Sequence, residues 1–177
     1  ISFINESWYS NSFAGTPAVV IPTYSGPKWY VSNDTGSDTN AGTGSETYPY
    51  KTITKALFRT GVGDTVYVYA GTYTETFSID TNGIFIIGAD SSNTIIDPPG
   101  DSTNTTLYGI YSINKTNITI KNLKITECYY GIDFNNVDSS IIVNVTTDFC
   151  GGTAGSGAGI FLENGSDSNA IRNCYAN

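Results

Sequence analysis

The sequence contains no histidine and no methionine, and its 16 acidic side chains outnumber its 8 basic ones, giving a formal net charge of −8. Without His, a nucleophile–His–acid triad is excluded. The scarcity of Lys and Arg argues against nucleic acid as a partner and against an anionic membrane surface, because both are bound through clustered basic side chains. No apolar run approaches the ~20 residues that a membrane-spanning helix requires.

Charged residues of either sign are also few, at 14% of the chain, whereas Thr, Ser, Asn and Gly dominate and Tyr occurs 13 times. This composition is typical of extracellular β-rich proteins, so we expect an extracellular or cell-surface location. The sequence also contains Asn-x-Ser/Thr triplets, which are candidate glycosylation sites in a secreted protein. They lie at Asn5, Asn33, Asn104, Asn114, Asn117, Asn144 and Asn164.

The sequence repeats itself at a fixed interval of about 22 residues, within the range typical of repeat proteins. The segment NLKITEC begins at Asn122 and the segment NVTTDFC begins at Asn144, and each runs from an Asn to a Cys. Tyr-Gly-Ile at 108–110 returns at 130–132, and a third copy with an insertion brings Gly-Ile-Phe at 159–161. A fixed period of this length indicates an architecture of stacked repeats.

Short extended segments follow one another after Asp64, each bounded by Asn, Gly or Asp, which tolerate the left-handed backbone of tight bends. With this period and no helix between them, these segments predict an all-β parallel β-helix of about five coils, stacked ~4.8 Å apart. In this fold Asn122, Asn144 and Asn173 occupy the same bend of successive coils, where we expect their amides to form an Asn ladder.

The three cysteines cannot all pair within one chain. Cys128 and Cys150 share a register, so stacked coils would bring their sulfurs together, as a disulfide or as a stack of thiols. Cys174 instead takes the place of Leu123 and Val145, which is a core position. The alternative is that all three are small buried hydrophobic residues, and the sequence leaves both interpretations open.

One helix is predicted near 49–60, where Ile53, Ala56 and Leu57 share a face and Gly61 follows as a stop signal. The helix precedes the first coil of the β-helix. Since a terminal coil otherwise exposes its apolar core, we expect the helix to cover that end.

The segment before the first predicted strand, residues 1–27, forms an apolar N-terminal arm with Glu6 as its single charge. Two arrangements stay open for this arm: it packs along its own β-helix, or it adds as a strand to a neighbouring subunit. The sequence thus divides into the arm, residues 1–27, and a β-helix with its capping helix, residues 28–177.

The sequence WYVSNDTGSDTNAGTGSETYPYKTITKAL begins at Trp29, and GVGDTVYVYAGTYTE follows it. These residues resemble the opening module of right-handed parallel β-helix proteins of the pectate-lyase-like superfamily, and the match covers about a quarter of the chain. The resemblance implies a right-handed β-helix. It fits secreted polysaccharide lyases, uronate epimerases, surface adhesins and surface-layer proteins alike, so it says little about activity.

The loop DTGSDTNAGTGSE is a candidate metal site. It places Asp34, Asp38, Asn40 and Glu46 within thirteen residues. Oxygen ligands alternating with Gly suit calcium, although the spacing differs from that of an EF-hand. We therefore name these four side chains as a candidate calcium site, against the alternative of a solvated loop.

The resemblance implies that a polysaccharide lyase would need a Lys or Arg base, a cation held by acidic side chains and a basic groove. Lys121 and Lys124 flank an Asn bend, and we expect them to be solvated. Asp133 is the one acid at a repeat position of a predicted strand, with Tyr111 and Phe161 at the equivalent places. No second acid shares its register, so we assign no catalytic residue and favour a protein that is not an enzyme.

Two functions are compatible with these observations. The sequence favours an extracellular structural protein, a self-assembling subunit of a surface filament or layer, which forms homo-oligomers through end-to-end or arm-mediated contacts. The alternative is a carbohydrate-active protein, lyase-like or epimerase-like, or a sugar-binding β-helix module that belongs to a longer protein and takes a polysaccharide as partner.

Overall fold

The computed structural model describes residues 26–39, 42–100, 107–151 and 157–177. Within these ranges the chain forms thirteen strands and one short helix, and every recorded strand pair is parallel. The prediction of a right-handed parallel β-helix is therefore confirmed. Nearly all of the predicted N-terminal arm lies outside the described residues.

The helix and strands follow one another with short connections. They are β1 (Lys28–Val31), α1 (Ile53–Leu57), β2 (Thr65–Val68), β3 (Gly71–Tyr73), β4 (Phe77–Ser78), β5 (Phe85–Gly88), β6 (Thr94–Ile96), β7 (Tyr108–Thr116), β8 (Thr119–Thr126), β9 (Tyr130–Asp138), β10 (Ile141–Asp148), β11 (Ala158–Glu163), β12 (Ala170–Arg172) and β13 (Tyr175–Ala176). In the part of the chain that the structure describes, no helix has the length and apolarity needed to cross a membrane.

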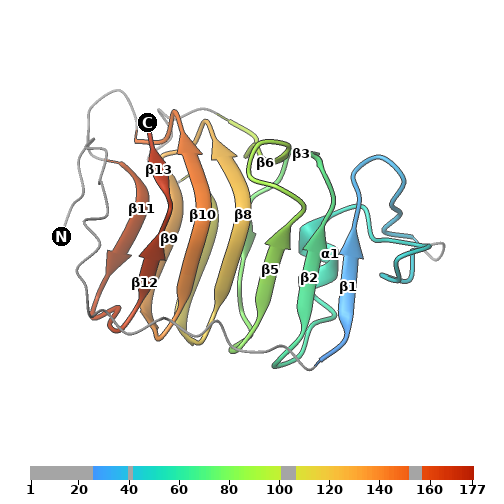
Figure 1. Ribbon diagram of the computed structural model, residues 1–177, viewed down its shortest axis with the longest axis horizontal. Helices are drawn as coiled ribbons and strands as arrows, with labels where there is room; N and C mark the ends of the chain where they lie inside the picture. Colours follow the sequence, from blue (N-terminus) through green and yellow to red (C-terminus); the bar gives the residue numbers. More distant parts are fainter. Residues whose placement is uncertain (1–25, 40–41, 101–106, 152–156) are drawn as a thin grey trace.

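The strands form two sheets that wrap around a common core. The larger sheet has nine strands along the path β1-β2-β5-β8-β10-β12, with β3, β6 and β13 beside that path. The smaller sheet has the order β11-β9-β7-β4. Figure 1 shows the strands of the larger sheet side by side along the long axis, with β9 partly hidden behind them and β11 at the left end.

The core consists of columns of aliphatic side chains from successive strands. Pairing in the larger sheet places Val66, Ile86, Ile120 and Ile142 in one such column, and each is at most 1% exposed. Because side chains alternate between the two faces of a strand, the next residue of each strand points outward. Burial of one such side chain contributes ~1.5–3 kcal/mol, so these columns account for much of the stability.

Four bends align along the cylinder from β7 onward, because residues with positive φ recur at paired positions. The four columns are Asn114, Asn136 and Asn164; Asn117, Ser139 and Ser168; Asn122, Asn144 and Asn173; and Glu127 with Phe149. Seven of these eleven residues are Asn, the side chain that best tolerates this left-handed backbone after Gly. The bends explain why the sequence is so rich in Asn.

The number of residues in a coil varies along the cylinder, and the step into β11 is one of the longer ones. Tyr108 of β7 pairs with Tyr130 of β9, and Tyr130 pairs in turn with Ala158 of β11, so the second step along the chain is longer than the first. The additional residues fall in the segment around 152–156, which lies outside the described residues. Despite this insertion, β9 and β11 remain in register.

The helix is shorter than predicted, because α1 spans only Ile53–Leu57 instead of reaching from 49 to 60. Tyr50 is extended and forms a parallel bridge with Val31, so the helix starts only after Thr52, whose side chain caps it by accepting from the Lys55 backbone N–H. Ile53 and Ala56 are completely buried, as expected for a helix that covers the core.

Candidate functional site

The outer face of the smaller sheet carries an unusual group of aromatic and acidic side chains, which we call the aromatic–acidic face. Strand pairing aligns Tyr111 of β7, Asp133 of β9 and Phe161 of β11 in its central column. Tyr108 and Tyr130 form the column on one side. On the other side lie Ile113, Asn135 and Glu163.

The aromatic rings of this face stack along the cylinder. The Tyr108 and Tyr130 ring centroids are 5.7 Å apart at an interplanar angle of 12°, and those of Tyr130 and Phe161 are 4.9 Å apart at 19°. Tyr111 leans against Tyr108 at 5.2 Å. Such stacking fixes the positions of the rings, and each ring remains half-exposed, so they form a firm apolar platform with polar hydroxyls.

Asp133 lies in the middle of these rings and is only 3% exposed. Its Oδ1 is buried and has no hydrogen-bond partner among the described residues. A buried carboxylate without a partner is strongly disfavoured in its charged form. Burial, together with the nearby charge of Glu163, raises the pKa of Asp133 from 3.8 to about 6.

Glu163 is the second acid of this face, two residues out of register with Asp133. It pairs with Asn135, whose Nδ2 donates a short hydrogen bond to Glu163 Oε1. Glu163 is half-buried and its charge acts on Asp133. The face thus places one carboxyl with a raised pKa close to a second, hydrogen-bonded carboxyl.

The tyrosines of the face are held in their neutral form. The pKa values of Tyr108, Tyr111 and Tyr130 are all raised, first by burial and then by neighbouring charged groups that include Asp133 and Glu163. Near neutral pH their hydroxyls therefore both donate and accept hydrogen bonds. Apolar rings, hydroxyls, an amide and two carboxyls together suit a ligand with alternating C–H and O–H groups.

The predicted calcium loop is only partly described, because Asn40 lies outside the described residues. Asp38 is engaged elsewhere: its carboxylate accepts hydrogen bonds from the backbone N–H groups of Lys51 and Thr52 and from Thr52 Oγ1, at 2.8 to 3.2 Å. Asp34 and Glu46 are exposed. Among described residues, no group of three or more Asp, Glu, Cys or His side chains is arranged to hold a metal ion, so the calcium site stays a prediction.

The Asn residues at 122, 144 and 173 occupy the equivalent bend of successive coils. Asn144 Nδ2 donates a hydrogen bond of 2.8 Å to Asn122 Oδ1, and Asn173 has the same positive φ. The structure contains a second column that was not predicted: Asn136 Nδ2 donates to Asn114 Oδ1, also at 2.8 Å. The spacing of this pair, which equals that of Asn122 and Asn144, was the signal that could have revealed it.

Of the candidate glycosylation sites, Asn5 and Asn104 lie outside the described residues. Asn33 is half-buried, and its Nδ2 donates to the Thr72 carbonyl at 2.8 Å. The remaining sites lie in exposed bends, where glycosylation stays a prediction. These sites are Asn114, Asn117, Asn144 and Asn164.

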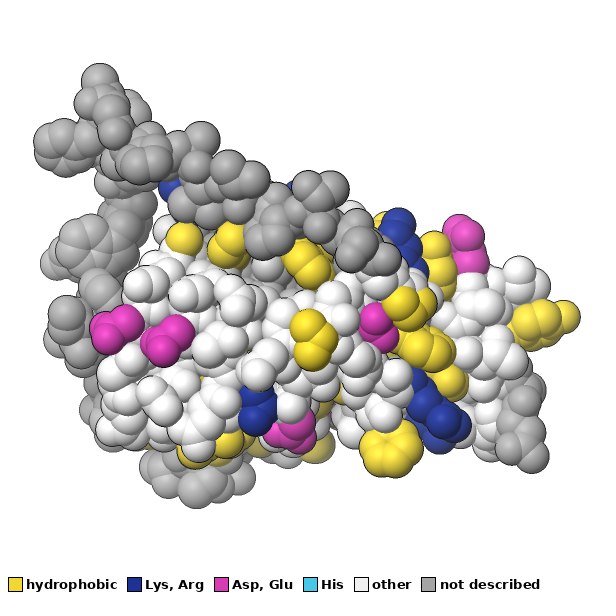
Figure 2. Space-filling view, turned by 90° about the horizontal axis from the view of Figure 1, so that it is seen from below, with side chains coloured by type: hydrophobic (Ala, Val, Ile, Leu, Met, Phe, Trp, Pro, Cys, Tyr) yellow, Lys and Arg dark blue, Asp and Glu magenta, His cyan; other side chains and the backbone are white. Residues whose placement is uncertain are grey.

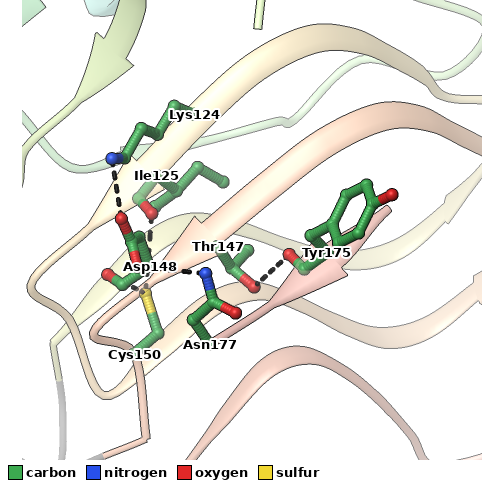
Figure 3. Close-up of polar contacts among 7 residues, drawn as sticks. All are labelled: Lys124, Ile125, Thr147, Asp148, Cys150, Tyr175 and Asn177. Carbon is green, nitrogen blue, oxygen red and sulfur yellow. Dashed lines mark hydrogen bonds and ion pairs between the residues drawn. The ribbon is translucent and has the colours of Figure 1, made fainter. Parts of the chain in front are cut away.

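Lys124 was expected to be solvated, but it forms an ion pair instead: its Nζ lies 2.7 Å from Asp148 Oδ2 on the adjacent strand β10. Figure 3 shows this ion pair on the outer side of the larger sheet, with Asn177 Nδ2 donating to Asp148 Oδ1 at 3.5 Å. The pair lowers the pKa of Asp148. It links adjacent coils and leaves little free positive charge at this position.

A recess lies at the opposite end of the molecule, between α1 and β4. Its volume is about 560 Å³, and Leu57, Phe58 and Phe77 contribute to its lining. Hydrophobic and basic side chains gather toward this end in Figure 2, and Phe58 is 82% exposed. Because the lining holds no buried charged or polar side chain, this recess is a weaker candidate than the aromatic–acidic face.

No family model and no curated protein matches the sequence. The structure is similar to a crystal structure of a mutant pectin methylesterase in complex with hexasaccharide IV, with a TM-score of 0.61 and 13% identity over 88% of this chain and 49% of that one. It is also similar to a rhamnogalacturonan lyase, with a TM-score of 0.59 and 16% identity over 85% of this chain and 51% of that one.

The chain thus spans about half the length of these two structures. At such low identity the likeness concerns the fold, and it does not transfer an activity. The resemblance seen in the residues from Trp29 to Tyr73 is confirmed at the level of the fold: the chain is a parallel β-helix and is similar in structure to these two proteins.

Proposed function

We propose that this chain is part of an extracellular carbohydrate-active protein and that its aromatic–acidic face binds a glycan. The observation that carries the proposal is Asp133, a nearly completely buried carboxyl whose Oδ1 has no hydrogen-bond partner among the described residues, surrounded by aromatic rings. Such an arrangement costs stability and makes no contribution to the core. A role toward a ligand gives a reason for keeping it.

The shape of the face supports a sugar polymer as ligand. Tyr108, Tyr130 and Phe161 stack along the axis of the cylinder and offer apolar surface over three successive strands. Asn135 and Glu163 add hydrogen-bonding groups at one side of this row. Binding sites for small molecules combine such an aromatic lining with a few polar groups that fix orientation.

The charge of the face favours a neutral glycan over a uronate polymer. Its three columns contain two acids, Asp133 and Glu163, and no Lys or Arg. A polyuronate would meet like charges here, and like-charge contacts weaken binding. The lyase-like and epimerase-like alternatives need a basic group beside a uronate, so this face supports them less well than it supports binding of neutral sugars.

The test compares binding of neutral polysaccharides, such as glucans, galactans and xylans, with binding of polygalacturonate by affinity electrophoresis and calorimetry. We expect binding to a neutral glycan, and Tyr130→Ala to weaken it about tenfold or more, as loss of a central aromatic contact does. Tyr67→Ala is the matched control, because Tyr67 is a half-exposed tyrosine on the larger sheet.

Two results would contradict the proposal. One is equal weakening of binding by Tyr67→Ala and Tyr130→Ala, and the other is a preference for polygalacturonate. Release of reducing ends from the bound glycan, measured in the same samples, would show in addition whether the glycan is hydrolysed, a reaction in which glycosidases use a pair of carboxyls.

A second candidate is the self-assembling structural subunit. Strands β12 and β13 each pair with β10 on one side, and Ile171 and Tyr175 are 39% and 66% exposed at this end of the larger sheet. Among the described residues no further strand pairs with β12 or β13 on their other side, and a parallel edge that is open can accept a strand from another copy. Light scattering and electron microscopy of the purified chain test this candidate, which predicts filaments in the absence of any sugar.

A further inference from the structure

We infer that Cys128 and Cys150 form a disulfide that links two successive coils of the β-helix. Both stand as free thiols in the structure, and their Sγ atoms lie only 2.7 Å apart, so a small approach would bring them to bonding distance. Neither side chain has to leave its place in the fold for this bond to form, because both already point at one another from the same bend.

The pairing register accounts for this proximity. Strands β8 and β10 pair in parallel up to Thr126 and Asp148, and one cysteine follows two residues after each. Between them stand Glu127 and Phe149, with positive φ values of 53° and 55°. Paired strands lie ~4.8 Å apart, which falls in the ~4.4–6.8 Å range of Cα separations that a disulfide spans.

The surroundings allow oxidation from one side. Cys128 is completely buried, whereas Cys150 is half-buried at the outer bend. In Figure 3 the Cys150 sulfur lies beside the carbonyl oxygens of Ile125 and Asp148, at 3.9 and 3.7 Å. Cys150 is the more exposed of the two, and the neighbouring Cys128 side chain lowers its pKa, so Cys150 is the thiol that reacts first.

The reaction requires a disulfide oxidant, for which oxidised glutathione serves as the probe. The Cys150 thiolate attacks one sulfur of the oxidant and releases one glutathione thiolate, which leaves a mixed disulfide on Cys150. Cys128 then loses its proton and attacks the Cys150 sulfur, which releases the second glutathione. Two protein thiols are oxidised, and one oxidant disulfide is reduced to two thiols.

Cys174 stays outside this pair and provides an internal control. It follows the Asn173 bend, at the register of Leu123 and Val145, and its Sγ contacts the Arg172 carbonyl at 3.2 Å and the Ile142 carbonyl at 3.7 Å. It therefore remains a free thiol when the other two are joined.

Thiol counting on the full chain tests the inference. After treatment with oxidised glutathione, removal of excess reagent, and alkylation in denaturant, we expect one alkylated cysteine, Cys174, and a proteolytic fragment that links Cys128 to Cys150. With reductant added before alkylation, all three react. Three alkylated cysteines without reductant, or a cross-link that includes Cys174, would overturn the inference.

The effect on stability gives an independent measurement. A disulfide between Cys128 and Cys150 closes a loop and so restricts the unfolded chain, which stabilises the fold. We therefore expect reduction to lower Tm by on the order of 10 °C. Cys174→Ser should show the same loss on reduction. The double variant Cys128→Ser, Cys150→Ser should show no change on reduction, and a loss as large as that of the unaltered chain would contradict the assignment.

Discussion

Asp133 of β9 and Glu163 of β11 lie on the same outer face of the smaller sheet, although the pairing register sets them two residues apart. One carboxyl is buried with an oxygen that has no hydrogen-bond partner among the described residues, and the other accepts a hydrogen bond from Asn135. This relationship differs from that of Asp148 on the larger sheet, which is paired with Lys124.

The raised pKa of Asp133 predicts a stability that falls as pH rises. The pKa is 3.8 for the ordinary group and about 6 in the fold, so the native state binds this proton more tightly than the unfolded chain does. The stabilisation is fully present below about pH 3.8 and is lost as pH rises through 6. We expect Asp133→Asn to remove this dependence, so that its Tm relative to the unaltered chain rises by at least about 3 °C from pH 4 to pH 8.

Asp148→Asn is the control for the sign of this effect. Lys124 lowers the pKa of Asp148, so its contribution is present above the ordinary pKa and is lost as pH falls. This variant should be slightly destabilised at pH 8 and indistinguishable from the unaltered chain at pH 2. If both variants shift in the same direction with pH, the interpretation of Asp133 is wrong.

The Asn ladder predicts different costs for two substitutions of Asn144. Asn144→Ala loses the hydrogen bond to Asn122 and forces Ala into a backbone with φ of 54°, which together cost about 2–3 kcal/mol. Asn144→Gly loses the same hydrogen bond but accepts the backbone, and should cost about 1 kcal/mol less than Ala. Urea denaturation measures both, and equal stability of the two variants would refute this account of the bend.

The alternation of strand β10 predicts opposite outcomes for neighbouring residues. Ile142 is 1% exposed in the core column, so Ile142→Asp buries an unpaired charge and should destabilise the fold by more than about 4 kcal/mol. Val143 points outward and is half-exposed, so Val143→Asp should cost less than about 1 kcal/mol. Circular dichroism with thermal melting checks this, and a cooperative, stable Ile142→Asp variant would disprove the register.

The hydrogen bonds of Asp38 predict a role that does not need calcium. Asp38→Ala removes three acceptor contacts to Lys51 and Thr52 ahead of α1, and should cost about 1–2 kcal/mol in EDTA and in calcium alike. Asp34→Ala, at an exposed position of the same loop, is the control. A Tm loss that appears only in the presence of calcium would instead support the predicted calcium site.

The sequence predicts the fold well because the signals of a β-helix are local and repeated. Asn122 and Asn144 mark the same bend in successive repeats, and Ile120 and Ile142 mark the same core column. The boundaries of the helix are less predictable. Tyr50 lies within the segment predicted as a helix, but it pairs with Val31 and is therefore extended. No local sequence pattern shows this pairing.

The aromatic–acidic face is harder to predict. Asp133 stands out in the sequence as an acid among aromatic positions, but its burial and its oxygen without a hydrogen-bond partner among the described residues are properties of the folded chain that no local pattern shows. The sequence does not predict Glu163 as a partner of Asp133, because Glu163 is a diagonal neighbour and pairs with Asn135 instead. The longer step from β9 to β11 also hides the relationship, since it breaks the interval seen between β7 and β9. Periodicity identifies residues that stack directly and misses those that meet obliquely.

The aligned bends have a consequence for how this protein could grow. Since the bends at 117, 122 and 127 return at 139, 144 and 149, one repeat of the sequence contains everything that one coil needs. A duplicated copy of 119–140 would find both its neighbours already in register and would lengthen the cylinder by ~4.8 Å. The length of such a cylinder depends on the number of repeats, so duplication of a repeat within the gene can extend it without a new fold.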